Sequence, residues 1–108
     1  MDADVILVGG GLAHSLIALR LAETRPELRL LLLEQEPALG GNHTWCFHSA
    51  DVTVAQLNDL QPVIEQSWDS YRIRFPDRLR DIQGGYHAIV SERLHRVVAE
   101  RLGDAVRC

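Results

Sequence analysis

The chain has 108 residues, 46% of them apolar, and a formal net charge of −4. This size and composition predict one small packed domain and exclude a disordered chain. All eleven basic residues are arginines, scattered apart from a loose group between Arg72 and Arg80, so the chain lacks the concentrated basic face of a nucleic-acid-binding protein.

The first predicted elements are a strand and a helix joined by three glycines. Asp4 to Val8 is a short apolar run that predicts a strand buried on both faces, and it leads into Gly9-Gly10-Gly11. Leucines recur at helical spacing from Leu12 to Leu21. Arg25-Pro26 closes this helix because a residue before proline avoids helical dihedral angles.

A second strand is predicted over the apolar run Leu28 to Leu33, directly before Glu34. Its short length, and its place after a strand and a helix, favour a strand parallel to the first. Residues 3–35 therefore form a βαβ unit, and the fold class is α/β with a Rossmann-like arrangement that binds FAD or NAD(P).

The glycine turn has the chemistry of a dinucleotide site. Gly9 allows a tight exit from the strand, and Gly11 lets a pyrophosphate approach the free N–H groups at the start of the helix. Glu34 is placed to accept hydrogen bonds from ribose hydroxyls, which argues against the 2′-phosphate of NADP. His14 stands where the third glycine of G-x-G-x-x-G would fall. An ordinary βαβ turn without a ligand is the alternative interpretation.

Residues 36–50 are interpreted as a loop that contacts the cofactor. Gly40-Gly41-Asn42 is turn chemistry, and backbone N–H groups together with Asn42 or His43 could bind the pyrophosphate or the flavin ring. A structural turn carrying the core aromatics Trp45 and Phe47 is the alternative. The spacing of the histidines and Cys46 fits no closed zinc site, and a Cys46–His48 nucleophilic pair lacks a third orienting group.

A helix and a hairpin are predicted over residues 51–90. Residues 53–66 have helical character, with Asp51 or Thr53 as the N-cap and Pro62 limiting its regularity. Tyr71 to Phe75 alternates like a half-buried strand, and Ile82 to Val90 returns as another. Trp68 and Tyr71 are interpreted as core residues.

A final helix and the start of a strand are predicted over residues 91–108. Ser91 can cap the helix, Gly103 stands at its C-terminal end, and Arg93 in its first turn could face the adenine or ribose. Because the chain stops where a strand begins, we expect the N-terminal part of a larger protein, incomplete at the C-terminus. No signal peptide or membrane-spanning run is predicted, so we expect a cytoplasmic protein.

Several segments resemble, in order, the N-terminal region of bacterial lycopene β-cyclases. They are Val8-Gly-Gly-Gly-Leu-Ala-His-Ser-Leu-Ile-Ala-Leu-Arg-Leu21, Leu-Leu-Leu-Glu34, Gly40-Gly-Asn-His-Thr-Trp-Cys-Phe-His48, Tyr71-Arg-Ile-Arg-Phe-Pro76, Gly85-Tyr86 and Ser91-Glu-Arg-Leu94. The Gly-Gly-Asn-His-Thr-Trp stretch is the most specific. The family also tends to lack the third glycine, so His14 agrees with it.

The resemblance implies a glutathione-reductase-type fold and FAD as cofactor, used in reduced form with NAD(P)H as reductant. The implied reaction is a non-redox cyclization of the ends of lycopene to β-ionone rings. An acid protonates the terminal alkene, the cation closes the ring, and loss of a proton gives the β-ionone end, while the reduced flavin stabilises the cation. The cofactor-binding residues that map onto this chain are Gly9, Gly10, Gly11, Leu12, Glu34, Gly41, Asn42, His43 and Arg93.

No catalytic residue maps here, because the family's acidic motif lies beyond residue 108. We expect the full-length protein to be the enzyme, in contact with the inner face of the membrane, with no metal and no nucleic acid as partner. Two alternatives stay open. One is an FAD- or NAD(P)-dependent oxidoreductase of the same fold, and the other is an inactive fragment that at most binds nucleotide.

Overall fold

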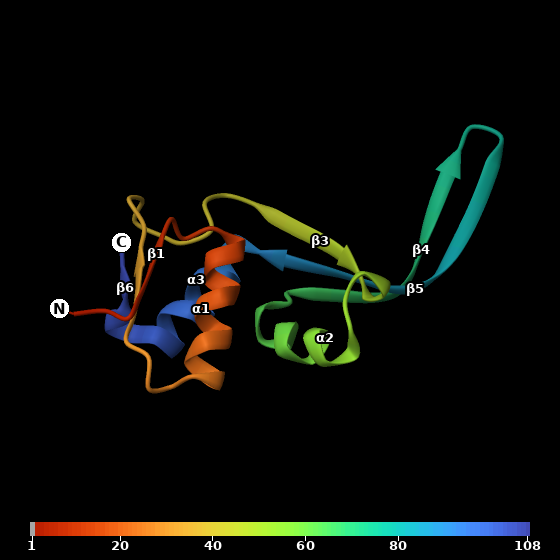
Figure 1. Cartoon of the computed structure of the whole chain (residues 1–108). Helices are drawn as coiled ribbons and strands as arrows, with labels where there is room; N and C mark the ends of the chain where they lie inside the picture. The colour runs from red at the N-terminus through yellow and green to blue at the C-terminus, as the bar shows by residue number, and fades with distance from the viewer. Residues whose placement is uncertain (1) are drawn as a thin grey trace. The chain divides into compact units, whose positions relative to one another are not determined.

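A computed structural model describes residues 2–108, and it divides them into two compact units (Figure 1). Unit 1 contains residues up to His43 together with Ser91–Cys108, and unit 2 is Thr44–Val90. The architecture mixes α-helices with two small sheets, so the predicted α/β class is confirmed at this level. Among the described residues, no helix is long and apolar enough to cross a membrane.

Unit 1 is built on a three-stranded parallel sheet in the order β1-β2-β6. Its strands are β1 (Val5–Val8), β2 (Leu30–Leu33) and β6 (Val106–Arg107). Val5 pairs with Leu30 and Val8 with Leu33, so β1 and β2 end at the same edge of the sheet. The strand–helix–strand pattern predicted from the sequence is therefore present.

Two helices, α1 (Leu12–Thr24) and α3 (Ser91–Leu102), cover one side of this sheet (Figure 1). Small side chains at Ser15 and Ala18, both fully buried, line the inner side of α1. Leu94 and Val98 bury the apolar side of α3, and the helix ends before Gly103, whose φ of +52° favours glycine. The boundaries predicted for both helices are confirmed.

One expectation for β1 is wrong. A strand buried on both faces was predicted, yet the side chains of Ile6 and Val8 are 55% and 72% exposed. The physical reason is that α1 and α3 cover only the opposite face of the sheet, to which Leu30 and Leu32 contribute buried side chains. The apolar run shows that these residues are hydrophobic, but it does not show which element packs on each face of the strand.

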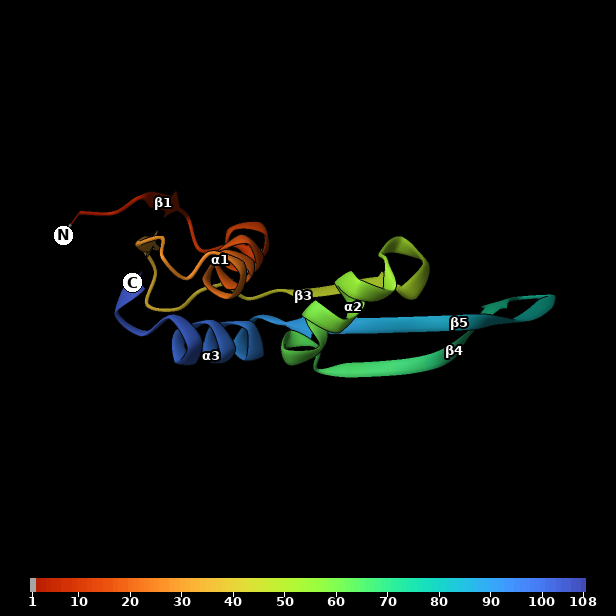
Figure 2. The ribbon, with the colours of Figure 1, turned by 60° about the horizontal axis from the view of Figure 1, so that its bottom comes forward.

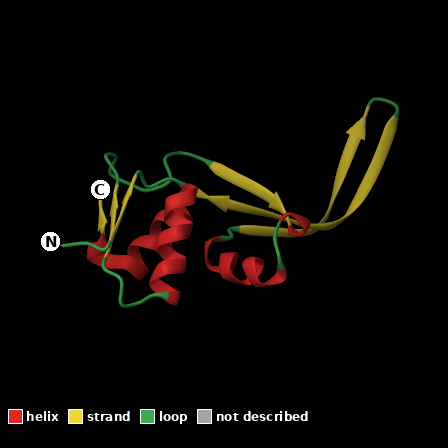
Figure 3. Ribbon diagram, viewed as in Figure 1, coloured by secondary structure: helices red, strands yellow, loops and turns green. Residues whose placement is uncertain are grey.

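Unit 2 is an antiparallel sheet in the order β3-β5-β4 (Figure 3). Its strands are β3 (Thr44–His48), β4 (Gln66–Phe75) and β5 (Arg78–Val90). Residues 44–48 were predicted within a loop and instead form β3. Figure 2 shows β4 and β5 continuing side by side beyond β3 as a two-stranded ribbon.

A short helical segment joins β3 to β4. It consists of the turn η1 (Ser49–Asp51), the helix α2 (Val54–Leu60) and the turn η2 (Gln61–Val63). Thr53 caps α2: its hydroxyl accepts a hydrogen bond from the Gln56 amide at 3.1 Å, and the Gln56 side chain accepts one from the Thr53 amide. Pro62 lies in η2, so α2 is shorter than the helix predicted from the sequence.

The two faces of the unit 2 sheet differ. One face carries buried His87, whose ring nitrogens lie 2.7 Å from the Ser49 hydroxyl and 2.8 Å from the Ser67 hydroxyl. The other face carries Trp68, which was predicted as a core residue but is 44% exposed. The prediction that Trp68 is a core residue is therefore wrong for the residues that the structure describes.

Candidate functional site

Two glycines in the turn between β1 and α1 have different features: Gly9 has an unusual backbone conformation, and Gly11 has free space beside it. Gly9 has a φ of +93°, a conformation that side chains other than glycine rarely adopt, and its amide bonds the Leu33 carbonyl at 2.7 Å. Gly11 is the N-cap of α1 and has no side-chain cap. A Cβ placed on Gly11 would meet no atom within 4 Å, so space is open directly in front of the free N–H groups of α1.

Gly10 has a different role, because it is packed against its neighbours. A Cβ at this position would lie 2.2 Å from Cδ2 of buried Leu39 and 3.3 Å from Cβ of Glu34. The Gly10 amide donates to Glu34 Oε1 at 2.9 Å, and the Gly10 carbonyl accepts from the Gly40 amide at 2.7 Å. The turn is therefore held by the end of β2 and by the loop that follows it.

Glu34 is half-buried and its two carboxylate oxygens accept separate backbone hydrogen bonds. Oε2 accepts from the Glu36 amide at 2.9 Å, and Oε1 accepts from Gly10. These donors, the Glu36 amide foremost, lower the pKa of Glu34 below its ordinary value. The group is thus an anion at neutral pH, with lone pairs left for further donors such as hydroxyls.

His14 turns back to the glycine turn instead of packing between helix and sheet. Its Nδ1 lies 2.8 Å from the Gly9 carbonyl oxygen. The close packing that a third glycine would allow is provided one residue later by Ser15, and by Ala18, both without exposed surface. His14 is therefore compatible with the same helix placement.

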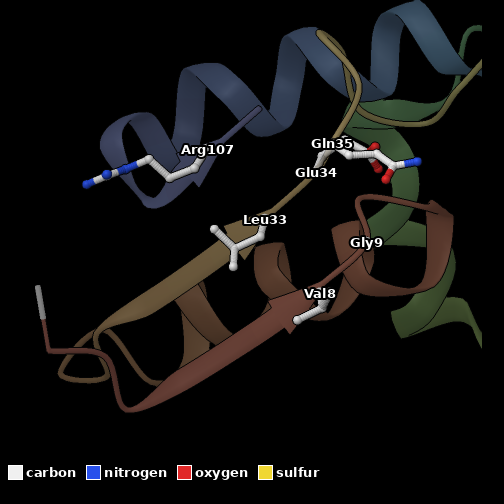
Figure 4. A pocket seen from close by; sticks show the side chains of 6 residues that line it. All are labelled: Val8, Gly9, Leu33, Glu34, Gln35 and Arg107. Atoms are coloured by element: carbon white, nitrogen blue, oxygen red, sulfur yellow. The ribbon is translucent and has the colours of Figure 1, made fainter.

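A cleft of about 450 Å³ opens at the carboxyl ends of the three parallel strands (Figure 4). Its lining residues are Val8, Gly9, Leu33, Glu34, Gln35 and Arg107. In Figure 4 the side chain of Arg107 points away from Glu34, and its Nε donates to the Asp104 carbonyl at 3.1 Å. Ligands of open α/β sheets bind in the crevice beyond the carboxyl ends of the strands, which is where this cleft lies.

The loop after β2 is tied to the start of α3. The His43 amide donates to the Ser91 hydroxyl at 3.3 Å, and the Ser91 amide donates to the His43 carbonyl at 3.0 Å. The Leu39 amide donates to His95 Nδ1 at 2.9 Å. Gly41 has a φ of +64°, which explains the glycine between these two anchors.

The structure brings part of the predicted site together. Gly10 bonds Glu34, Gly9 bonds the preceding residue Leu33, and Gly11 caps the adjoining helix, which begins at Leu12. Gly41, Asn42 and His43 are exposed on the anchored loop, while Arg93 is half-buried in the first turn of α3. Sequence reasoning missed Leu39 and His95, which position the loop. Their contact joins residues 56 apart in the chain, and no local pattern signals it.

Residues 4–108 match the sequence model of a family described as "Lycopene cyclase protein". The chain belongs to the lycopene cyclase family. This match runs through both units and includes the glycine turn, Glu34 and the anchored loop.

Curated members of the lycopene cyclase family resemble the chain over most of its length. The lycopene beta-cyclase of Pantoea ananas is 45% identical over 93% of the chain and 26% of the relative, and that of Pseudescherichia vulneris is 46% identical over 95% and 27%. The enzyme of Paracoccus sp. (strain N81106 / MBIC 01143) is 37% identical over 99% and 28%. The chain therefore spans about a quarter of the length of these relatives.

Proposed function

We propose that the protein containing this chain is a lycopene β-cyclase, an enzyme that closes the ends of lycopene into β-ionone rings without net oxidation or reduction. The observation that carries the proposal is the family match over residues 4–108, together with relatives of that name at 37–46% identity. The substrate is accordingly an uncharged C40 carotene. No catalytic acid is assigned to the residues of this chain.

We propose further that unit 1 is the ADP-binding part of a Rossmann-like FAD domain of the glutathione-reductase type. Three features support this, and the first two are the parallel order β1-β2-β6 and the cleft at the carboxyl ends of these strands. A third is the exposed outer face of β1, since parallel sheets are covered on both faces in complete domains.

The glycine turn fits the pyrophosphate of FAD. The space in front of Gly11 is open, and the N-terminal amides of α1 offer hydrogen bonds and a positive dipole end to an anion. Glu34, with its lowered pKa, offers acceptors for ribose hydroxyls beside Gly9. Its negative charge disfavours a 2′-phosphate at the same place.

The other proposed cofactor contacts come from the anchored loop and α3. Leu12, Gly41, Asn42, His43 and Arg93 complete the set of FAD-binding residues. When bound and reduced by NAD(P)H, the flavin would supply negative charge that stabilises the cation formed during cyclization. Within this chain the residues bind and orient the cofactor, and no proton transfer is assigned to them.

We also propose that the protein is cytoplasmic and lies on the inner face of the membrane, where an apolar carotene dissolves. The end of the β4–β5 ribbon supports this. Phe75 and Leu79, 51% and 50% exposed, lie there beside Arg74 and Arg78. Exposed apolar side chains flanked by arginines fit an anionic lipid surface.

The cyclase proposal is tested by expressing the full-length protein in a host that accumulates lycopene, followed by pigment analysis. We expect β-carotene or its one-ring precursor, which have the elemental composition of lycopene. A product with added oxygen or altered hydrogen content would instead identify an oxidoreductase of the same fold. Unchanged lycopene in the presence of a flavin-loaded protein would overturn both.

A further inference from the structure

Four aromatic side chains gather on one face of the unit 2 sheet, and we call them the aromatic face: His48, Trp68, Tyr71 and Tyr86. Tyr86 lies at the centre. Its ring centroid is 5.0 Å from that of His48, 5.8 Å from Trp68 and 5.6 Å from Tyr71. His48 and Tyr71 also meet edge to face at 5.3 Å. These are the separations of interacting aromatic rings.

Strand register explains why these residues share a face. His48 and Trp68 pair with Tyr86 from the two neighbouring strands, and directly paired residues point to the same side of a sheet. A bulge between Trp68 and Ser70 shifts the alternation, so that Tyr71, three residues after Trp68, returns to the same side. The cluster thus draws on all three strands of the sheet.

The aromatic face lies on the side of the unit 2 sheet opposite to His87. The opposite face carries Phe47, whose ring is tilted against that of His87 with centroids 5.1 Å apart, and buried His87, which lies within hydrogen-bonding distance of the Ser49 hydroxyl of η1. On the aromatic face, by contrast, Trp68 is 44% exposed and the other three members are half-buried.

This face is also uncharged over a long stretch. The paired residues on it, from Thr44–Val90 at one end to Tyr71–Ile82 at the other, include no arginine, aspartate or glutamate. The first charge on this side comes with Arg80, paired with Ile73 in the ribbon. A hydrogen bond with Cys46 raises the pKa of Tyr86, so its phenol stays neutral. Such a surface suits an uncharged, extended molecule and not an anion.

We propose that the aromatic face binds the polyene chain of the carotene substrate, and this inference rests on the proposed function. Conjugated polyenes present flat π surfaces, which pack on aromatic rings with good dispersion contact. Beyond the four rings, Ile73 and Phe75 continue on the same side of the ribbon, beside their paired neighbours Arg80 and Arg78. A nucleotide would find no cation among the paired residues of the aromatic face.

The test measures lycopene retained by the full-length, FAD-loaded protein without NAD(P)H, so that no cyclization is driven by a reduced cofactor. Protein is mixed with lycopene in detergent and passed through a gel-filtration column, and carotene absorbance per protein is recorded. Replacing Trp68→Leu together with Tyr71→Leu should lower retention by about tenfold, because two ring contacts are lost. Trp68→Phe with Tyr71→Phe should restore it.

Val54→Ala is the matched control, because this exposed apolar side chain lies on α2, outside the aromatic face, and its loss should leave retention unchanged. Flavin content and circular dichroism check folding, and Trp68→Leu alone replaces the double variant if that one fails to fold. Wild-type retention in the leucine variants, or no retention by the wild type, would overturn the proposal.

Two other occupants give different results. If a second copy of the protein covers the face, the leucine variants elute as a smaller species and retain as much lycopene as the wild type. If another segment of the protein covers the face, the leucine variants lose thermal stability and retain as much lycopene as the wild type. Either result overturns the inference. Cyclase activity with NAD(P)H is measured separately, so a wild type that retains lycopene without converting it would refute only the proposed function.

Discussion

Gly10 and Gly11 are neighbours in the sequence but differ in what surrounds them, which allows fold and cofactor effects to be separated. We predict that Gly10→Ala destabilises the protein by about 1–3 kcal/mol, because its Cβ would overlap buried Leu39. Gly11→Ala should leave stability nearly unchanged, since no atom lies within 4 Å of its added Cβ. It should instead lower FAD retention.

Urea unfolding and flavin absorbance of the purified full-length protein check this pair. The diagnostic result is a crossed pattern, with stability lost mainly in the Gly10 variant and flavin lost in the Gly11 variant at wild-type stability. Full flavin content in Gly11→Ala, and in a bulkier Gly11→Leu, would contradict the assigned pyrophosphate site.

Glu34 gives a prediction for the pH dependence of stability. Its pKa is lowered in the folded state from an ordinary value of 4.5, so the folded protein holds the carboxylate anion more strongly than the unfolded chain does. Its contribution is therefore fully present above pH 4.5 and is lost as the pH falls through the lowered value. We predict that Glu34→Gln unfolds with a shallower loss of stability on acidification.

Urea titrations of wild type and Glu34→Gln at neutral pH and at about pH 3 measure the effect. The gap between the two proteins should be larger at neutral pH and should narrow in acid. Glu36→Gln is a suitable control, because the Glu36 backbone amide that donates to Glu34 is retained in that variant. If the difference in unfolding free energy between the two proteins stays constant with pH, the two amides do not stabilise the charge of Glu34.

At the scale of elements, the sequence predicts those parts whose pattern is local. The helices α1 and α3 have regular apolar spacing with a proline or glycine at the end, and both are confirmed. The strand β3 was missed because aromatic and polar residues on Thr44–His48 show no clear apolar alternation. A strand of this kind is defined by its pairing with β5, which is 40 residues away for the pair Phe47–His87.

The ribbon formed by β4 and β5 provides the element-scale prediction. Arg72 pairs with Asp81 at 2.7 Å, whereas among the described residues Arg78 and Arg80 have no carboxylate partner. We predict that Arg78→Gln with Arg80→Gln weakens binding to anionic vesicles by about thirtyfold, since each arginine near such a surface contributes about 1 kcal/mol. Arg72→Gln should have a smaller effect.

Vesicle sedimentation with and without phosphatidylglycerol measures this binding in the full-length protein. Added salt should weaken the wild type more than the double variant, because the attraction is electrostatic. Replacing Phe75→Ser should reduce binding to both kinds of vesicle, since its contribution is apolar. Equal binding by wild type and all variants would rule out the ribbon as the membrane contact.

At the scale of the whole molecule, the sequence predicts the βαβ core of the candidate site and not its surroundings. The spacing from Gly9 to Glu34 requires a strand pair and a helix, so their proximity follows from local patterns. The contact of Leu39 with Gly10 and His95 depends on how a loop meets a distant helix. Which groups pack on the aromatic face and on the exposed face of β1 depends on partners that the local sequence patterns do not specify.

The uncovered face of β1 leads to a prediction about the full-length protein. Ile6 on β1 and Val54 on α2 are both exposed here, 55% and 79%. By exposure alone, Ile6→Thr and Val54→Thr would both be harmless. Because a parallel sheet is normally covered on both faces, and the relatives are about four times longer, we expect Ile6 to be buried in the full-length protein.

Ile6→Thr should therefore cost about 1–3 kcal/mol in urea unfolding of the full-length protein, the free energy of an apolar side chain lost from a buried position. Val54→Thr should cost less than about 0.5 kcal/mol, as surface substitutions do. Both substitutions keep a β-branched side chain, so backbone preference changes little between them. Equal and small effects would mean that the outer face of this sheet stays open in the full-length protein. Unit 1 would then lack the second layer of helices that a Rossmann-like domain requires, which would contradict that assignment.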